Sequence, residues 1–142
     1  MRKILDNIEE YALLVLLPPV ALVLAMPRPK AMKRLWSALA QFEPERIVIV
    51  NAAKVERNYF DTHWLEPARV RALLVEGLEQ AAATRLPAVD VRMRLKPFVE
   101  DELDALCPPG LRLVAHPGAG RLGDLVGPDT AGVTLAVGPE GG

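Results

Sequence analysis

Two turns that contain glycine follow apolar runs, and they are the segments of this sequence best suited to hold a ligand. Val133 to Val137 is followed by Gly138-Pro139-Glu140-Gly141-Gly142, and Leu111 to Ala115 is followed by His116-Pro117-Gly118. Glycine lets the backbone approach a ligand closely, and proline stiffens a turn. Ligands of α/β sheets bind beyond the carboxyl ends of strands. If the two strands are neighbours, we expect the turns to line one crevice that can hold an adenine or a ribose.

Each turn taken alone is a weak signal, because glycine-proline turns at strand ends are usually only turns. The sequence contains no P-loop motif, so a nucleoside triphosphate site of that kind is not indicated. The two turns therefore carry an argument only as a pair.

A second candidate site consists of basic side chains after the first buried run, Val20 to Met26. The run leads into a helix whose first turn favours anions, so cations placed there indicate a phosphate-binding patch. A solvated charged face is the alternative, and the net charge of −1 neither indicates nor excludes a nucleic-acid partner. The basic residues at the run's end and in the helix, followed by those after the next strand, are Arg28, Lys30, Lys33, Arg34, Lys54 and Arg57.

The remaining reactive or aromatic side chains have structural interpretations. Trp36 fits the apolar stripe of a helix, and Tyr59, Phe60 and Trp64 are expected to pack under a loop rather than to stack on RNA. His63 has no second histidine at ligand spacing, and Cys107 is the single cysteine. These counts argue against an internal disulfide, a cysteine-based zinc site or any other metal site.

The composition suits one domain with a real core, since 51% of the 142 residues are hydrophobic. The apolar stretch from Tyr11 to Met26 is interrupted by Pro18-Pro19 and is preceded by acidic residues, unlike a signal peptide or a membrane span. We therefore expect no membrane association and a cytoplasmic protein.

The pattern of apolar residues predicts an α/β layered domain. Val20–Met26, Ala31–Glu43 and Ile47–Val50 together predict a βαβ unit, which should be right-handed with parallel strands. Alternation from Val89 to Leu95 predicts an edge strand. The other expected elements are a hairpin within residues 3–17, a helix from Pro67 to about Ala83, a short helix over Phe98–Leu106, and buried strands over Leu111–Ala115 and Gly132–Val137.

Five segments, in order and spacing, resemble one family. They are residues 24–30 (LAMPRPK), 79–80 (EQ), 96–101 (KPFVED), 116–118 (HPG) and 138–142 (GPEGG), and together they resemble the RsmE family of the SPOUT superfamily. This resemblance implies an S-adenosylmethionine-dependent methyltransferase acting on N3 of a uridine in 16S ribosomal RNA of the small subunit. It also implies a homodimer and a SPOUT-like α/β knot over residues 20–142, with residues 1–19 the remnant of a PUA-like RNA-binding domain.

The resemblance further implies roles for particular residues. The basic residues named above would bind rRNA phosphates, Gln80 would lie near the site, and Arg28 would stabilise the uridine anion. Glu140 would orient the cofactor or accept a proton. S-adenosylmethionine would be held by His116, Pro117, Gly118, Gly138, Pro139, Glu140, Gly141 and Gly142.

The sequence departs from the family pattern at both ends. Most of the PUA-like domain and the segment after Gly142 are missing, so the chain is expected to be an inactive fragment that binds the cofactor poorly and exposes an apolar patch. Two other functions stay open: a non-catalytic RNA-binding or dimerisation module on a decayed scaffold, and a nucleotide-binding α/β protein without an RNA partner.

Overall fold

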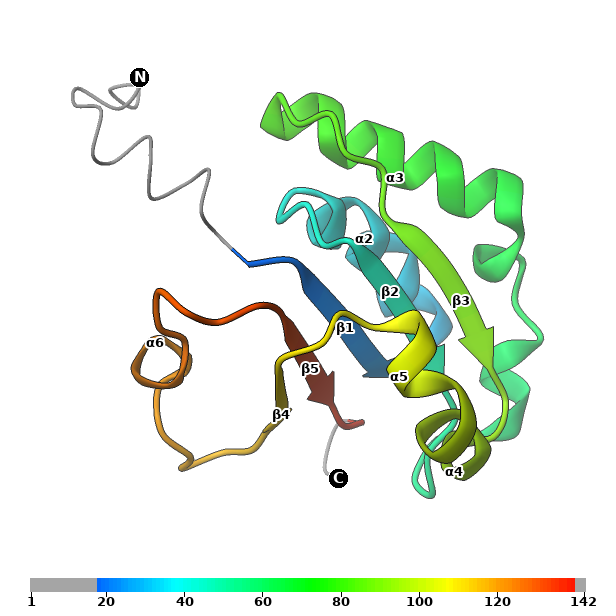
Figure 1. Cartoon of the computed structure of the whole chain (residues 1–142). Coiled ribbons are helices and arrows are strands. Elements are labelled where there is room, and N and C mark those ends of the chain that lie inside the picture. The colour runs from blue at the N-terminus through cyan, green and yellow to red at the C-terminus, as the bar shows by residue number, and fades with distance from the viewer. Residues whose placement is uncertain (1–17, 140–142) are drawn as a thin grey trace.

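A parallel sheet of five strands in the order β3-β2-β1-β5-β4 forms the centre of the molecule (Figure 1). The computed structural model describes residues 18–139. Every strand pair is parallel, so all carboxyl ends lie at one edge of the sheet. The strands are β1 (Val20–Ala25), β2 (Arg46–Val50), β3 (Ala88–Arg92), β4 (Leu111–Ala115) and β5 (Val133–Val137).

Two long helices, α2 (Pro29–Ala40) and α3 (Pro67–Ala81), cover one face of the sheet over β1, β2 and β3 (Figure 1). Both helices begin with proline, whose fixed φ suits a first turn. Their apolar stripes bury Trp36 and Leu74 against Ile47 and Ile49. The predicted βαβ unit is confirmed, although α2 begins two residues earlier than expected, at Pro29.

A short helical stretch covers part of the opposite face. It consists of α4 (Leu95–Pro97), a π-helical turn (Phe98–Glu102) and α5 (Leu103–Leu106), and it buries Phe98 against β1 and β2. The short helix predicted over Phe98–Leu106 is therefore confirmed, and the helical stretch begins three residues earlier, at Leu95. The strand expected to reach Leu95 ends at Arg92, because the helical stretch begins at Leu95. β3 is an edge strand, as predicted.

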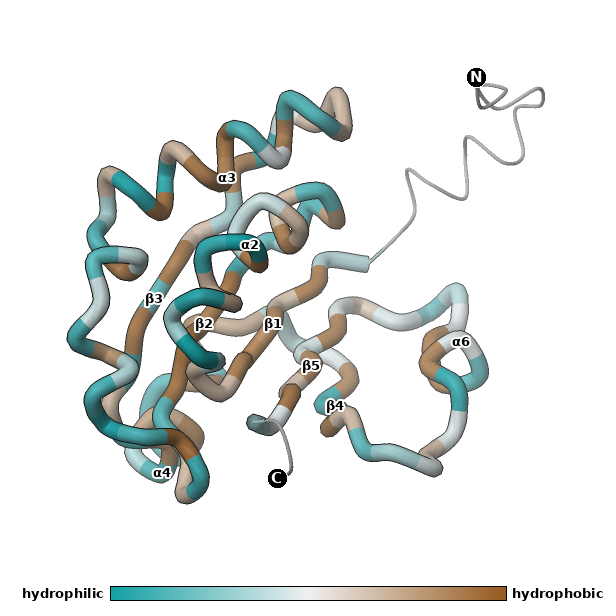
Figure 2. Tube along the Cα trace, turned by 180° about the vertical axis from the view of Figure 1, so that it is seen from behind, coloured by the Kyte–Doolittle hydropathy of each residue, from teal (hydrophilic) through white to brown (hydrophobic). Residues whose placement is uncertain are grey.

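β4 was expected to be buried, and this prediction is wrong. β4 is the second edge strand, and the side chain of Val114 is 73% exposed. α5 reaches β4 through an ion pair of 2.7 Å between Asp104 and Arg112, but α6 (Leu122–Leu125) lies on a loop that extends away from the sheet (Figure 2). Apolar runs form buried strands at β1 and β2, but the apolar run of β4 forms an exposed strand.

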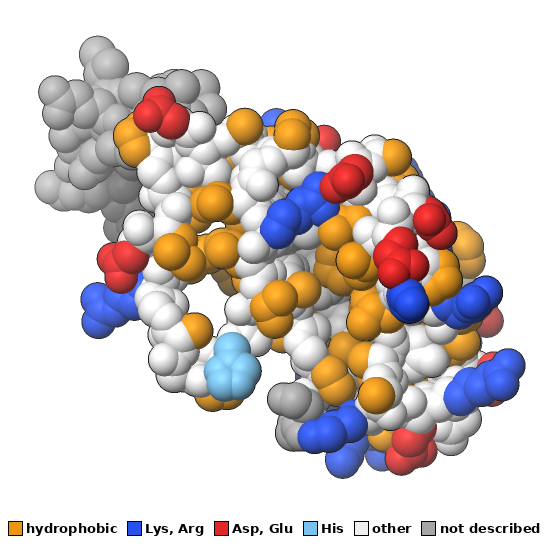
Figure 3. Space-filling view, turned by 60° about the horizontal axis from the view of Figure 1, so that its bottom comes forward, with side chains coloured by type: hydrophobic (Ala, Val, Ile, Leu, Met, Phe, Trp, Pro, Cys, Tyr) orange, Lys and Arg blue, Asp and Glu red, His pale blue; other side chains and the backbone are white. Residues whose placement is uncertain are grey.

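The expected apolar patch is present beside this edge. Figure 3 shows hydrophobic side chains exposed over the middle of the face seen from the carboxyl edge. The exposed large side chains near β4 and the helical stretch are Leu95, Val99, Val114 and Val137.

Residues 1–17, with the expected hairpin and nearly all of the expected PUA-like remnant, lie outside the described residues, as do Glu140, Gly141 and Gly142. None of the helices within residues 18–139 is long and apolar enough to cross a membrane.

Candidate ligand-binding site at the carboxyl edge of the sheet

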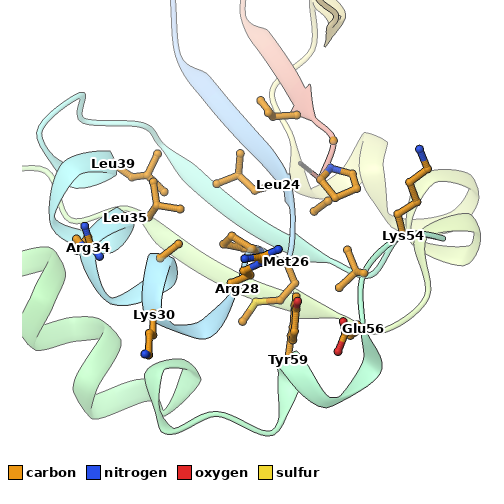
Figure 4. Close-up of a pocket in the computed structure, with 17 residues that line it drawn as sticks. Leu24, Met26, Arg28, Lys30, Arg34, Leu35, Leu39, Lys54, Glu56 and Tyr59 are labelled. Carbon is orange, nitrogen blue, oxygen red and sulfur yellow. The ribbon is translucent and has the colours of Figure 1, made fainter. Parts of the chain in front are cut away.

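An open cavity of about 820 Å³ lies beyond the carboxyl ends of β1 and β5 (Figure 4). The end of β1 supplies Leu24, Ala25 and Met26, and the end of β5 supplies Val137. Met26 is only 1% exposed, and its amide donates a hydrogen bond to the Val50 carbonyl over 2.9 Å. The floor of the cavity is therefore fixed by the sheet.

The walls of this cavity combine apolar and basic side chains from separate elements. Leu35 and Leu39 come from α2, and Tyr59 comes from the 3-10 turn Arg57–Phe60. One carboxylate, Glu56, and several cations complete the lining. The cations are Arg28, which precedes α2, Lys30 and Arg34 on α2, and Lys54 after β2 (Figure 4).

Several residues predicted from the sequence therefore meet in one place. Arg28, Lys30, Arg34 and Lys54 line the same cavity as Gly138 and Pro139, although they are far apart in the chain. Lys33 and Arg57 do not line it. Lys33 lies over the ring of Trp64, and Arg57 is exposed at the start of its 3-10 turn.

The turn at His116-Pro117-Gly118 is arranged differently from the prediction. β4 and β5 are neighbours, with Ala115 opposite Val137, as the shared crevice required. However, His116, Pro117 and Gly118 are exposed and do not line the cavity. The predicted single crevice is therefore not formed within the described residues, because the chain after the edge strand β4 turns outward. Gly118 has φ +81°, which favours glycine at this position.

Gln80 does not lie near the cavity. Its side-chain carbonyl accepts a hydrogen bond from the Gln41 amide over 3.2 Å, beyond the carboxyl end of α2. That end of α2 leads into the start of β2, so Gln80 lies at the amino edge of the sheet, opposite the cavity. The prediction for Gln80 is wrong for the single chain, because α3 runs antiparallel to the strands and carries its last turn away from the site.

A glycine pattern that sequence reading missed lies in the loop after β4. Residues 118–123 (GAGRLG) have the GxGxxG spacing of dinucleotide-binding turns. In such turns the last glycine allows a helix to pack closely on the strand. Here a Cβ on Gly118, Gly120 or Gly123 would meet no atom of the described residues within 4 Å, and α6 has four residues. The loop therefore lacks the close packing of helix on strand that dinucleotide-binding turns show, and the pattern does not indicate a dinucleotide site.

A second cavity, of about 390 Å³, lies on the opposite face of the sheet and is almost wholly apolar. Phe98 and Leu103 of the helical stretch line it together with Val114 and Ala136. Val137 and Gly138 line both cavities, so the end of β5 separates them.

The structural interpretations of the aromatic residues are confirmed. Trp36 is fully buried, and Tyr59, Phe60 and Trp64 pack against the core beneath α2 and α3. Within the part of the chain that the structure describes, no group of three or more His, Cys, Asp or Glu side chains could hold a metal ion.

Comparison with known proteins identifies the family. A model described as an RNA methyltransferase domain matches residues 16–142. The chain belongs to this RNA methyltransferase family. A curated relative, the ribosomal RNA small subunit methyltransferase E of Treponema pallidum, is 30% identical over 80 residues, which cover 56% of this chain and 30% of that protein. The predicted resemblance to the RsmE family is confirmed.

Solved structures share the fold of this family member. The ribosomal RNA small subunit methyltransferase E of Neisseria gonorrhoeae, bound to S-adenosyl methionine, has a TM-score of 0.64 at 20% identity, covering 88% of this chain and 50% of that one. A methyltransferase of Legionella pneumophila in complex with the same cofactor has a TM-score of 0.68 at 18% identity, with 88% and 50% covered. The chain thus spans about half the length of these structures.

Proposed function

We propose that this chain forms the core of an RNA methyltransferase that moves a methyl group from S-adenosylmethionine to N3 of a uridine in 16S ribosomal RNA. The observation that carries the proposal is the cavity at the carboxyl edge, where cations, an apolar wall and a glycine turn meet. The family match and the relative named for ribosomal RNA support an RNA substrate.

The volume and the lining side chains of the cavity fit the proposed cofactor. Its volume of about 820 Å³ lies within the range of ligand sites, roughly 300–1,000 Å³. Leu24, Val55 and Tyr59 offer apolar surface for the adenine of the cofactor, and the cations offer partners for its carboxylate or for phosphates of the RNA. A Cβ on Gly138 would meet no atom of residues 18–139 within 4 Å, so there is open space beside this glycine at the mouth of the site.

The chemistry assigns distinct tasks to residues of this chain. S-adenosylmethionine supplies a methyl group on a positively charged sulfur, which a ring nitrogen attacks in line. N3 of uridine must lose its proton at or before attack, and a nearby cation stabilises the resulting anion. We assign that task to Arg28, phosphate binding to Lys30, Lys33, Arg34, Lys54 and Arg57, and proton acceptance or cofactor orientation to Glu140.

The other parts of the proposed function rest on the resemblance alone. They are the trefoil knot, the PUA-like domain, the homodimer with a cofactor site near its interface, and cofactor contacts from His116, Pro117, Gly118, Gly138, Pro139, Glu140, Gly141 and Gly142. His116 to Gly118 are exposed and lie outside the cavity, so cofactor contacts from this turn rest on the resemblance and not on the geometry.

Calorimetric titration of S-adenosylmethionine and of its demethylated product tests the proposal. We expect binding by a protein that extends through the family's full methyltransferase domain, and weak or no binding by the 142-residue chain. Gly138→Ala in the longer protein should preserve folding and weaken binding about 10-fold or more, since the methyl group would occupy the mouth of the site. Absence of binding in both wild-type proteins would contradict the enzyme and favour the non-catalytic RNA-binding or dimerisation module.

A further inference from the structure

A cluster of basic and aromatic side chains lies outside the cavity, where α2 and α3 begin. The Nζ atom of Lys33 lies 5.1 Å from the centroid of the Trp64 ring, and the guanidinium carbon of Arg69 lies 5.7 Å from it. The His63 ring is 4.2 Å from the same ring, tilted by 48°. We call Lys33, His63, Trp64 and Arg69 the Trp64 cluster.

The ring at the centre of this cluster is held rigidly. The indole Nε1 of Trp36 donates a hydrogen bond of 2.8 Å to the Trp64 carbonyl, and Trp64 packs against the core. Lys33, His63 and Arg69, in contrast, are exposed. Cation–π contacts with this ring therefore favour defined positions for two exposed cations at the surface.

The cluster continues the basic lining of the cavity. Lys30 lines the cavity, and Lys33 lies one turn further along α2, toward α3. The first turns of α2 and α3 contain no acidic residue. Since cations near a helix N-terminus are unfavourable, an anion bound beside them would stabilise this region. Glu66 pairs with Arg69 at 3.0 Å, but both side chains are more than half exposed, so the pair is easily exchanged for another anion.

We propose that the Trp64 cluster binds the phosphodiester backbone of substrate RNA outside the cavity, with Lys33 and Arg69 each contacting a phosphate. The Trp64 ring packs against the core and lies under both cations, so the contact to RNA is made through phosphates and not through base stacking. The match to an RNA methyltransferase family favours RNA over an acidic protein. The inference rests on the proposed RNA substrate. It extends the RNA contact from the target base to nucleotides beside it.

Salt dependence of RNA binding is the test, because each phosphate contact releases counterions. A short single-stranded RNA with a fluorescent label is titrated at several salt concentrations into the family-length protein and its variants. Lys33→Ala and Arg69→Ala should each weaken binding several-fold and reduce the slope of log K against log salt by about 0.7. Trp64→Phe should retain most of the slope, since a ring still lies under both cations.

One variant serves as a control, and another should have the opposite effect. Arg71 is exposed on α3 two residues after Arg69, about 200° around the helix, so Arg71→Ala should leave the slope unchanged. Glu66→Gln removes the competing carboxylate and should strengthen RNA binding.

Unchanged slopes for Lys33→Ala and Arg69→Ala, with native circular dichroism, would overturn the inference. So would equal affinity for polyglutamate, which would indicate an acidic protein partner. Cofactor titration separates this result from the proposed function: intact cofactor binding with unchanged slopes removes only the cluster, while loss of cofactor binding with the expected slopes removes only the methyl transfer.

Discussion

At the scale of single residues, the backbone and the side chain of Arg28 have different roles. Its carbonyl accepts hydrogen bonds from the amides of Ala31 at 2.9 Å and Met32 at 3.1 Å, and so starts α2. Its guanidinium is exposed and lines the cavity. The backbone of Arg28 supports the helix while its side chain is available to a ligand.

Arg28→Ala is therefore expected to remove methyl transfer without harming the fold. The variant keeps the backbone carbonyl that begins α2, so the thermal transition of the family-length protein should not change. Loss of a charge that stabilises the uridine anion should lower the rate by about 100-fold or more, while calorimetric affinity for S-adenosylmethionine stays constant. Unchanged turnover would show that Arg28 has no part in the reaction.

Cys107 gives a prediction about pH. Burial raises the pKa of its thiol, and the nearby Thr134 hydroxyl and Arg112 charge oppose the shift only in part. Above the ordinary thiol pKa, the unfolded chain releases the proton and the native chain keeps it, so the free energy of unfolding falls as pH rises toward the native pKa. Urea unfolding at pH 7 and pH 10 should show a larger loss of stability for the wild type than for Cys107→Ala.

At the scale of elements, the local sequence pattern predicts individual helices and strands well. It does not predict which distant segments contact one another. Helical stripes and apolar runs are sufficient to predict α2, α3 and the βαβ unit from the sequence, because each of these elements buries one continuous face. They are insufficient for β4, whose apolar residues look like those of β5 although no described helix covers the strand. Gln80 was misplaced for a similar reason, since helix direction decides which end of the sheet its last turn reaches.

The contact between α2 and α3 depends on one glycine. A Cβ on Gly77 would overlap the Ser37 carbonyl and come within 2.9 Å of its Cα. Gly77→Ala should lower the free energy of unfolding by about 1–3 kcal/mol, because the helices must separate to admit the methyl group. Chemical denaturation measures this loss. Gly123→Ala, at an open position in the loop that carries α6, is the matched control and should change stability little.

At the scale of the whole molecule, the helices cover the sheet unevenly. α2, α3 and the helical stretch bury most of β1 and β2, whereas β4 and the end of β5 are largely exposed (Figures 1 and 2). The end of β5 separates the basic cavity from the apolar one, so any segment that covers the apolar side also approaches Gly138. Cover over the apolar cavity and closure of the basic cavity are thus coupled.

Exposed apolar surface of this kind should make the 142-residue chain self-associate. Light scattering is expected to show an apparent mass that rises with concentration, and Val114→Lys should reduce the rise, because Val114 is 73% exposed beside other apolar side chains. Phe42→Lys is the control: Phe42 is 80% exposed but lines neither cavity, so its substitution should not alter association. A monodisperse wild-type chain, or equal effects of the two lysines, would show that the open side of the sheet does not drive association.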